Sequence, residues 1–113
     1  VAPRLGVELG GGKRLDADGQ LAGTPSVVFD AVALVLSESA GKRLAKDSAA
    51  EDFVRDAFGH LKAIAADDGA QAVLKAAAVE KDDGIVAATD PKGFIRAAKT
   101  RQWDREAKVR LLA

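Results

Sequence analysis

The feature that most constrains the fold of this chain is a run of six apolar residues, Ala31 to Leu36, between Asp30 and Ser37. An unbroken apolar run of this length is typical of a strand that is buried on both faces, as strands of parallel sheets are. Leu61 to Ala66 predicts a second buried strand, although Lys62 within it has to reach an edge or the surface. Two such strands indicate a sheet that is covered by helices.

Helix signals lie between and after these strands. Ser48 and Glu51 match a capping box, which predicts a helix that begins there and ends near Gly59. The turn at 67–69 places an aspartate before Ala70 to Ala78, which is the next expected helix. Because strands and helices alternate, we expect an α/β fold with parallel crossover connections.

Weaker elements complete the expected fold. Gly84 to Ala88 predicts a strand at a sheet edge, and Asp90–Pro91 pairs an N-cap with a proline suited to the first turn of a helix. Leu5 to Leu21 predicts a small exposed β-hairpin that turns at Gly10–Gly12. Residues 1–113 are expected to form one domain, because a chain of this length supports a single hydrophobic core.

Composition argues against several classes of partner. Seventeen basic and seventeen acidic residues cancel, so neither nucleic acid nor an anionic membrane is an expected partner. No apolar run approaches the roughly 18 residues that span a bilayer, and the lack of cysteine excludes disulfides and thiolate chemistry. A cytoplasmic location is expected. The chain begins at Val1 and contains no methionine, which indicates a processed product or a piece of a longer protein.

The candidate site lies where the two buried strands end. Ser37 and Glu38 follow the first strand, and Asp67 and Asp68 follow the second. Doubly wound folds bind ligands at these carboxyl ends, so the four side chains form a candidate crevice for a small anion or nucleotide. Two adjacent carboxylates fall short of a metal-ligand set, and helix capping explains them better.

No catalytic residue is assigned. Ala65 and Ala66 stand where a nucleophile elbow would raise a serine or cysteine above the sheet, and alanine has no nucleophilic atom. His60 is the only histidine and is better explained as a helix-terminal residue than as a base or metal ligand. An acid–base enzyme that uses His60, Asp67 and Asp68 stays open as a minor alternative.

Two further clusters favour structural explanations. The segment Gly10–Lys13 is only superficially similar to a phosphate loop, because it lacks the spacing of the glycines, the serine or threonine after lysine, and the helix that such a loop needs. Trp103, flanked by Arg101 and Arg105, has the residue types that stack on a nucleic-acid base. With zero net charge, burial of the C-terminal tail by Trp103 is the expected role.

Three stretches carry a family resemblance: GTPSVVFDAVALVLS, AAEDFVRDAFGHLKAI and GFIRAAKTRQWDREAKVR. Together with the hairpin segment LGVELGGGKRLDADGQLAGTPS and the Arg101–Trp103 end, they strongly resemble the C-terminal domain of large-subunit haem catalases. No single motif is diagnostic, but the order and spacing of the stretches cover nearly the whole chain.

The resemblance implies a flavodoxin-like three-layer sandwich with a mostly parallel sheet, similar to class I glutamine amidotransferases. The hydrolytic relatives carry a cysteine at the elbow, where this chain has Ala65–Ala66, so the resemblance implies a domain that kept the fold and lost the site. Haem in that family is held by a separate N-terminal domain through a tyrosine, and this chain contains no tyrosine. Haem and peroxide chemistry therefore belong to the parent catalase.

The family's domain also begins with a strand, a helix and most of another strand before the position of Val1. A sheet truncated in this way would expose apolar strand edges, which another copy or another piece of the parent would have to cover. We therefore expect partners in a haem-containing catalase core and in further copies, as a homotetramer.

Two functions stay open at this point. The favoured one is a non-catalytic accessory domain of a large-subunit catalase, which stabilises the oligomer or shapes access to the haem domain. The alternative is a free-standing flavodoxin-like module that binds a small anion or nucleotide near Ser37 and 65–68. The expected structural residues are apolar: Phe29, Val32, Leu34, Leu36, Phe53, Phe58, Leu61, Ile64 and Phe94.

Overall fold

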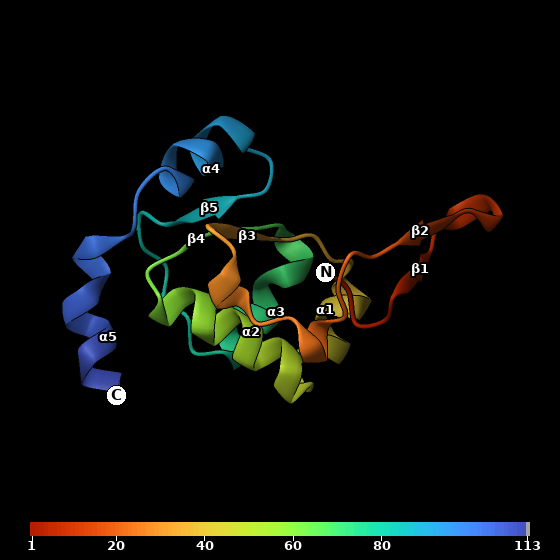
Figure 1. Cartoon of the computed structure of the whole chain (residues 1–113), viewed down its shortest axis with the longest axis horizontal. Helices are drawn as coiled ribbons and strands as arrows, with labels where there is room; N and C mark the ends of the chain where they lie inside the picture. The colour runs from red at the N-terminus through yellow and green to blue at the C-terminus, as the bar shows by residue number, and fades with distance from the viewer. Residues whose placement is uncertain (113) are drawn as a thin grey trace.

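The computed structural model describes residues 1–112, with side chains through Arg110. A three-stranded parallel sheet lies between two layers of helices, with α4 on one face and α1, α2 and α3 on the other (Figure 1). This arrangement confirms the predicted flavodoxin-like α/β fold. The helices are α1 (Glu38–Leu44), α2 (Ser48–Gly59), α3 (Gln71–Ala76), α4 (Pro91–Ala98) and α5 (Glu106–Leu112).

The strands β3 (Ala31–Leu34), β4 (Ala63–Ala66) and β5 (Ile85–Ala87) lie in the order β3-β4-β5. Their register pairs Val32 with Ile64 and Ile64 with Ile85. Every residue of the central strand β4 is buried, as an unbroken apolar strand between two helical layers should be.

The prediction that the first strand is buried on both faces was wrong. The strand β3 ends at Leu34 rather than Leu36, Ala33 is exposed, and Val35 is 74% exposed. The physical reason is position, because β3 is an outer strand that pairs only with β4. One edge of β3 and part of one of its faces therefore stay open.

Lys62 also departs from expectation, since it is only 5% exposed. It lies just before β4, after Leu61 has turned the chain with a positive φ of 63°. Lys62 lines a shallow depression together with Asp30 and Phe94, so the aliphatic part of its side chain is covered rather than held at an edge.

Helix capping follows the sequence with one correction. Asp47, not Ser48, caps α2, because its Oδ1 accepts a hydrogen bond from the Ala49 amide at 2.9 Å. Asp90 caps α4 as predicted, and Pro91 opens that helix. The helix α1 begins at Glu38, directly after its cap Ser37.

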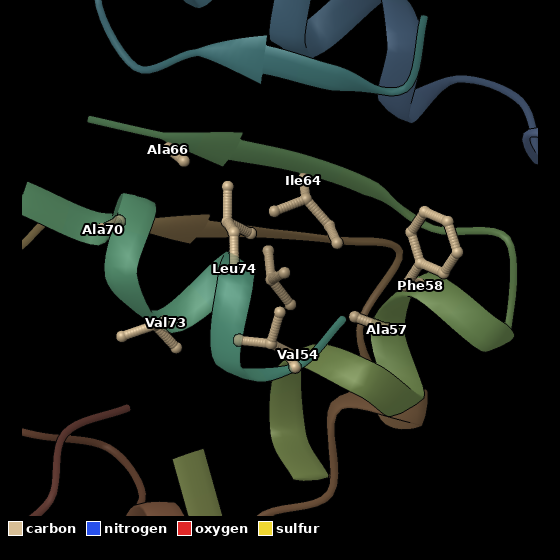
Figure 2. Close-up of a cluster of buried hydrophobic side chains, with 10 residues drawn as sticks. Val54, Ala57, Phe58, Ile64, Ala66, Ala70, Val73 and Leu74 are labelled. Atoms are coloured by element: carbon tan, nitrogen blue, oxygen red, sulfur yellow. The ribbon is translucent and has the colours of Figure 1, made fainter. Parts of the chain in front are cut away.

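The core forms between α2, α3 and the sheet (Figure 2). Val54, Ala57 and Phe58 of α2 meet Ile64 of β4, with α3 completing the cluster through residues such as Val73. Among the predicted structural residues, Val32, Phe58, Leu61 and Ile64 are buried, whereas Leu34, Leu36, Phe53 and Phe94 are half-buried and Phe29 is exposed.

The predicted hairpin is confirmed as β1 (Gly6–Glu8) and β2 (Arg14–Asp16), which pair antiparallel with Val7 opposite Leu15. It projects from the body of the domain (Figure 1). The turn needs Gly11 and Gly12, which both have a φ of 76° that side chains rarely adopt.

Candidate functional site

The structure brings the four predicted crevice residues to one end of the sheet. The strands β3 and β4 are parallel neighbours, so the segments that follow them leave the sheet side by side. Ser37 caps α1, where its Oγ accepts a hydrogen bond from the Ala40 amide at 3.2 Å. Glu38 and Asp68 are exposed, and their side chains make no hydrogen bond or ion pair with the described residues, so Asp67 is the residue that organises this end.

Asp67 uses both carboxylate oxygens within the protein. Its Oδ2 accepts a hydrogen bond from the Leu36 amide at 2.9 Å, and its Oδ1 accepts one from the Ala70 amide at 3.0 Å. The Asp67 amide in turn donates to the Leu34 carbonyl oxygen at 3.2 Å. The side chain therefore joins the loop after β3 to the short 3-10 turn Asp68–Ala70 instead of facing a ligand.

Two glycines close the same end further, and the sequence reasoning missed both. A methyl group placed on Gly69 would overlap the Leu36 carbonyl oxygen, and one on Gly41 would overlap the Gly69 carbonyl oxygen. The backbones of α1 and the 68–70 turn thus lie in direct contact. A glycine inside a helix, as at position 41 of α1, is the sequence signal that could have indicated this close approach. The crevice is filled by the chain itself.

The elbow position has neither the atom nor the geometry that nucleophilic chemistry needs. Ala65 and Ala66 are 2% and 5% exposed and belong to β4. Asp67, which follows them, has φ −88° and ψ −177°, an extended conformation without strain. Among the described non-glycine residues, positive φ occurs only at Leu61 and Ala78, and neither lies at this turn. A nucleophile elbow requires a strained turn at the strand end.

His60 lies at the opposite end of β4 from Asp67 and Asp68, because it precedes that strand and they follow it. The structure therefore does not assemble these three residues into an acid–base site. The imidazole is exposed at the end of α2, and the His60 carbonyl oxygen accepts a hydrogen bond from Arg101 at 3.1 Å. The segment Gly10–Lys13 forms the exposed tip of the hairpin and begins no α-helix.

The prediction that Trp103 anchors the C-terminal tail was wrong, since Trp103 is 61% exposed. Arg105 takes that role and is 3% exposed. Its Nε and Nη2 donate to the two Asp82 carboxylate oxygens at 2.7 and 2.9 Å. Its Nη1 donates to the carbonyl oxygens of Phe58 and Lys62 at 3.1 and 2.9 Å. A buried arginine is more easily desolvated than lysine and offers a planar fork of donors, which suits it to this position.

The guanidinium also lies 4.1 Å above the Phe58 ring, which adds a cation–π contact. Burial alone would raise the pKa of Asp82, but the hydrogen bond and charge of Arg105 outweigh it, helped by the Gly84 amide and by Lys108. The pKa of Asp82 therefore lies below its ordinary value. The Arg105 donors are occupied, and the guanidinium covers one face of the Phe58 ring. This cluster is therefore a structural clamp and not a ligand site.

Among the described residues, no three histidine, cysteine, aspartate or glutamate side chains lie together in a way that could hold a metal ion. Every helix within residues 1–112 is too short or too polar to cross a membrane.

Comparison with known proteins gives a consistent result. A family model described as the C-terminal domain found in long catalases matches residues 2–106. Catalase C from Rhizobium meliloti is 36% identical over 98% of this chain and 17% of its own length. Catalase-B from Dictyostelium discoideum is 34% identical over 91% of this chain and 16% of its own, and Catalase-2 from Bacillus subtilis is 35% identical over 85% and 15%. The chain thus spans about a sixth of the length of these relatives, and it belongs to the family of C-terminal domains of long catalases.

Proposed function

We propose that the chain is a non-catalytic accessory domain of a haem catalase, in which it stabilises the oligomer or shapes access to the haem domain. The relatives are named catalases, and the matched region is their C-terminal domain. The conversion of hydrogen peroxide to water and oxygen is then carried out by the remainder of the parent protein. A cytoplasmic location belongs to the same proposal, supported by the absence of cysteine.

The filled crevice is the observation that carries this proposal. Catalysis at the end of a parallel sheet needs an open position with reactive groups around it. Here both Asp67 oxygens accept backbone hydrogen bonds, and Gly41 and Gly69 let α1 and the 68–70 turn close over the position. The strand beneath ends in the methyl groups of Ala65 and Ala66.

Haem does not fit the residues of this chain. Protein ligands to haem iron are His, Cys, Met or Tyr, and of these the chain contains only His60. His60 is exposed at a helix end rather than inside an apolar pocket. We therefore assign haem to the parent catalase and derive no step through it in this domain.

Contact with the catalase core or with further copies, as in a homotetramer, is supported by apolar side chains that the domain leaves exposed. Val28, Val35, Ile95 and Trp103 are each more than half exposed. Zero net charge makes nucleic acid an unsuitable partner.

Removal of the matched region from Catalase C of Rhizobium meliloti tests this function. We expect the truncated enzyme to keep its peroxide turnover per haem while its assembly or thermal stability falls, measured by sedimentation and by inactivation on heating. Loss of turnover in a fully assembled truncated enzyme would contradict the accessory role. The isolated 113-residue chain should release no oxygen from peroxide.

The alternative, a module that binds a small anion or nucleotide, is favoured only by the position of Ser37 and Asp67 at the carboxyl ends of the strands. Titration calorimetry with inorganic phosphate and with AMP distinguishes the two. We expect no saturable heat, because Ser37 Oγ caps α1 and the Asp67 carboxylate repels anions. Saturable binding that Ser37→Ala abolishes would replace the accessory role with this one.

A further inference from the structure

Lys62 carries a buried ammonium group for which the described part of the chain supplies no partner. The residue is only 5% exposed, yet its Nζ makes no ion pair or hydrogen bond with the residues that the structure describes. Its backbone is fully engaged, because the amide donates to the Ala57 carbonyl oxygen at 2.9 Å and the carbonyl oxygen accepts from Arg105 at 2.9 Å. A buried charge is costly unless it is paired. The backbone thus fixes Lys62 at a position where its charge has no internal partner.

The ammonium group is open to a depression at the amino end of β4. Within the described residues, the buried side-chain atom that is both sealed from solvent and unpartnered is Oγ of Ser26, so Nζ of Lys62 keeps contact with solvent. Lys62 lines a depression of about 520 Å³ between the start of β4 and the second half of α4. The helix α4 packs mainly on β4 and β5, so the sheet beside it is left open toward β3 (Figure 1). A ligand can therefore approach the ammonium group from this side.

The walls of the depression combine apolar surface with basic groups. Phe94 is half-buried and Ile95 is 59% exposed, and both face the depression from α4. Lys99 and Arg101 lie on its rim, and Asp30 is the acidic residue among those that line it. Lys99 and Arg101 follow the C-terminal end of α4, where cations also stabilise the helix.

The buried lysine is therefore the group that helix stabilisation does not explain. Asp30 is exposed and forms no ion pair with Lys62, so it does not neutralise the ammonium group. Basic side chains outnumber acidic ones around the depression. This excess of positive charge beside apolar surface favours a ligand that is anionic at one end and apolar at the other.

We propose that the depression is a binding site for a carboxylate that carries an apolar chain. The carboxylate accepts a charge-assisted hydrogen bond from Nζ of Lys62, and the apolar chain lies against Phe94 and Ile95. Such a carboxylate belongs either to a free monocarboxylic acid or to an acidic side chain within an apolar stretch of a neighbouring polypeptide. The site lies at the opposite end of β4 from Asp67 and is separate from the filled crevice.

Titration of the 113-residue chain with hexanoate tests the site, followed by the chemical shifts of its backbone amides. We expect saturable shifts at Lys62, Ile95 and Ala98, which line the depression. Hexanol has the apolar chain without the charge, and inorganic phosphate has charge without the chain. Both should bind at least about tenfold more weakly than hexanoate, because each makes only one of the two contacts. Hexanol binding as tightly as hexanoate would overturn the proposal.

A matched pair of lysine substitutions separates binding from folding. Lys62→Met should weaken hexanoate binding at least about tenfold and leave hexanol binding unchanged, because it removes the ammonium group and keeps an apolar side chain. The variant should melt at the same temperature as the unsubstituted chain or higher, since it removes an unpaired buried charge. Lys75→Met removes the same charge from an exposed position of α3, on the other face of the sheet, and should not affect binding. Unchanged hexanoate binding in Lys62→Met would overturn the proposal.

Asp30→Asn tests whether an internal carboxylate already occupies the position. We expect this variant to bind hexanoate at least as tightly as the unsubstituted chain and to melt at the same temperature, because Asp30 does not pair with Lys62. Equal falls in melting temperature for Asp30→Asn and Lys62→Met would identify Asp30 as the partner and overturn the proposal.

A short acidic peptide distinguishes the two sources of the carboxylate. Acetyl-Leu-Glu-Leu-amide presents a side-chain carboxylate between apolar residues, and its titration is compared with that of hexanoate. Tighter binding of the peptide supports a neighbouring polypeptide as the source, and tighter binding of hexanoate supports a free acid. Saturable binding of neither would overturn the proposal. No readout depends on the assembly of a catalase, so this test can fail while the accessory role stands.

Discussion

Arg105 donates two hydrogen bonds, of 2.7 and 2.9 Å, to the carboxylate of Asp82, which lies 23 positions earlier in the sequence. Asp82 lies before β5, and Arg105 lies just before α5, so the pair fastens the C-terminal segment to the sheet end. The same guanidinium reaches the Phe58 carbonyl oxygen at the end of α2. One side chain therefore joins three parts of the fold: the end of α2, the segment before β5 and the segment before α5.

Arg105→Ala should lower the free energy of unfolding by about 3–5 kcal/mol, because it removes both side-chain hydrogen bonds to the Asp82 carboxylate and leaves the buried Lys62 carbonyl oxygen without a partner. Urea denaturation followed by circular dichroism measures the loss. Arg101→Ala is the matched control, since Arg101 is exposed and donates one hydrogen bond to the His60 carbonyl oxygen. The control should change stability by less than about 1 kcal/mol. Equal effects of the two substitutions would contradict the clamp.

The same pair predicts an acid-sensitive stability. The pKa of Asp82 in the folded chain lies below its ordinary value of 3.8, because the hydrogen bond and charge of Arg105 outweigh the effect of burial. A depressed pKa contributes stability that is present above the unfolded value and is lost as the pH falls through the folded value. We expect the free energy of unfolding to decline below about pH 4, and to decline less steeply in Asp82→Asn. If the free energy of unfolding declined equally with falling pH in the unsubstituted chain and in Asp82→Asn, Asp82 would not be the titrating group.

The elements of this fold could be predicted because their signals are local. The apolar run of β4, the aspartate at position 90 and the hairpin turn each depend on neighbouring residues, and all three appear in the structure. The burial of β3 depends on which strands lie beside it, and an apolar run carries no information about that. An outer strand and an inner strand can therefore have the same sequence pattern, which is why the exposure of Val35 was missed.

The candidate site likewise combines features that local sequence predicts with contacts between distant segments that it does not predict. Its four residues were placed at the correct end of the sheet from strand order alone. The closure by Gly41 and Gly69 depends on a contact between segments 28 positions apart, and the clamp between Asp82 and Arg105 on one 23 positions apart. Trp103 was expected to bury the tail, yet the arginine two positions later has the donors that the Asp82 carboxylate and the Lys62 carbonyl oxygen require.

Gly41→Ala should destabilise the domain by about 1–3 kcal/mol, although alanine ordinarily favours a helix over glycine. The added methyl group would overlap the Gly69 carbonyl oxygen and force α1 away from the 68–70 turn. Thermal unfolding monitored by circular dichroism measures the change. Gly59→Ala is the control, because a methyl group there meets open space at the end of α2, and it should be neutral or stabilising by up to about 1 kcal/mol. A stabilising effect at position 41 would mean that the crevice is not closed by backbone contact.

Ile64→Ala and Leu34→Ala should differ in cost, since they probe the inner and the outer strand of one sheet. Ile64 is fully buried between the helical layers, so its truncation should cost about 2–5 kcal/mol. Leu34 is half-buried on β3, so folding removes less of its apolar surface from water than it does for Ile64. Its truncation should therefore cost about 1–2 kcal/mol. Urea unfolding of both variants under one condition provides the comparison. Equal costs for the two substitutions would show that Leu34 is as well buried as Ile64, against the exposure of the outer strand.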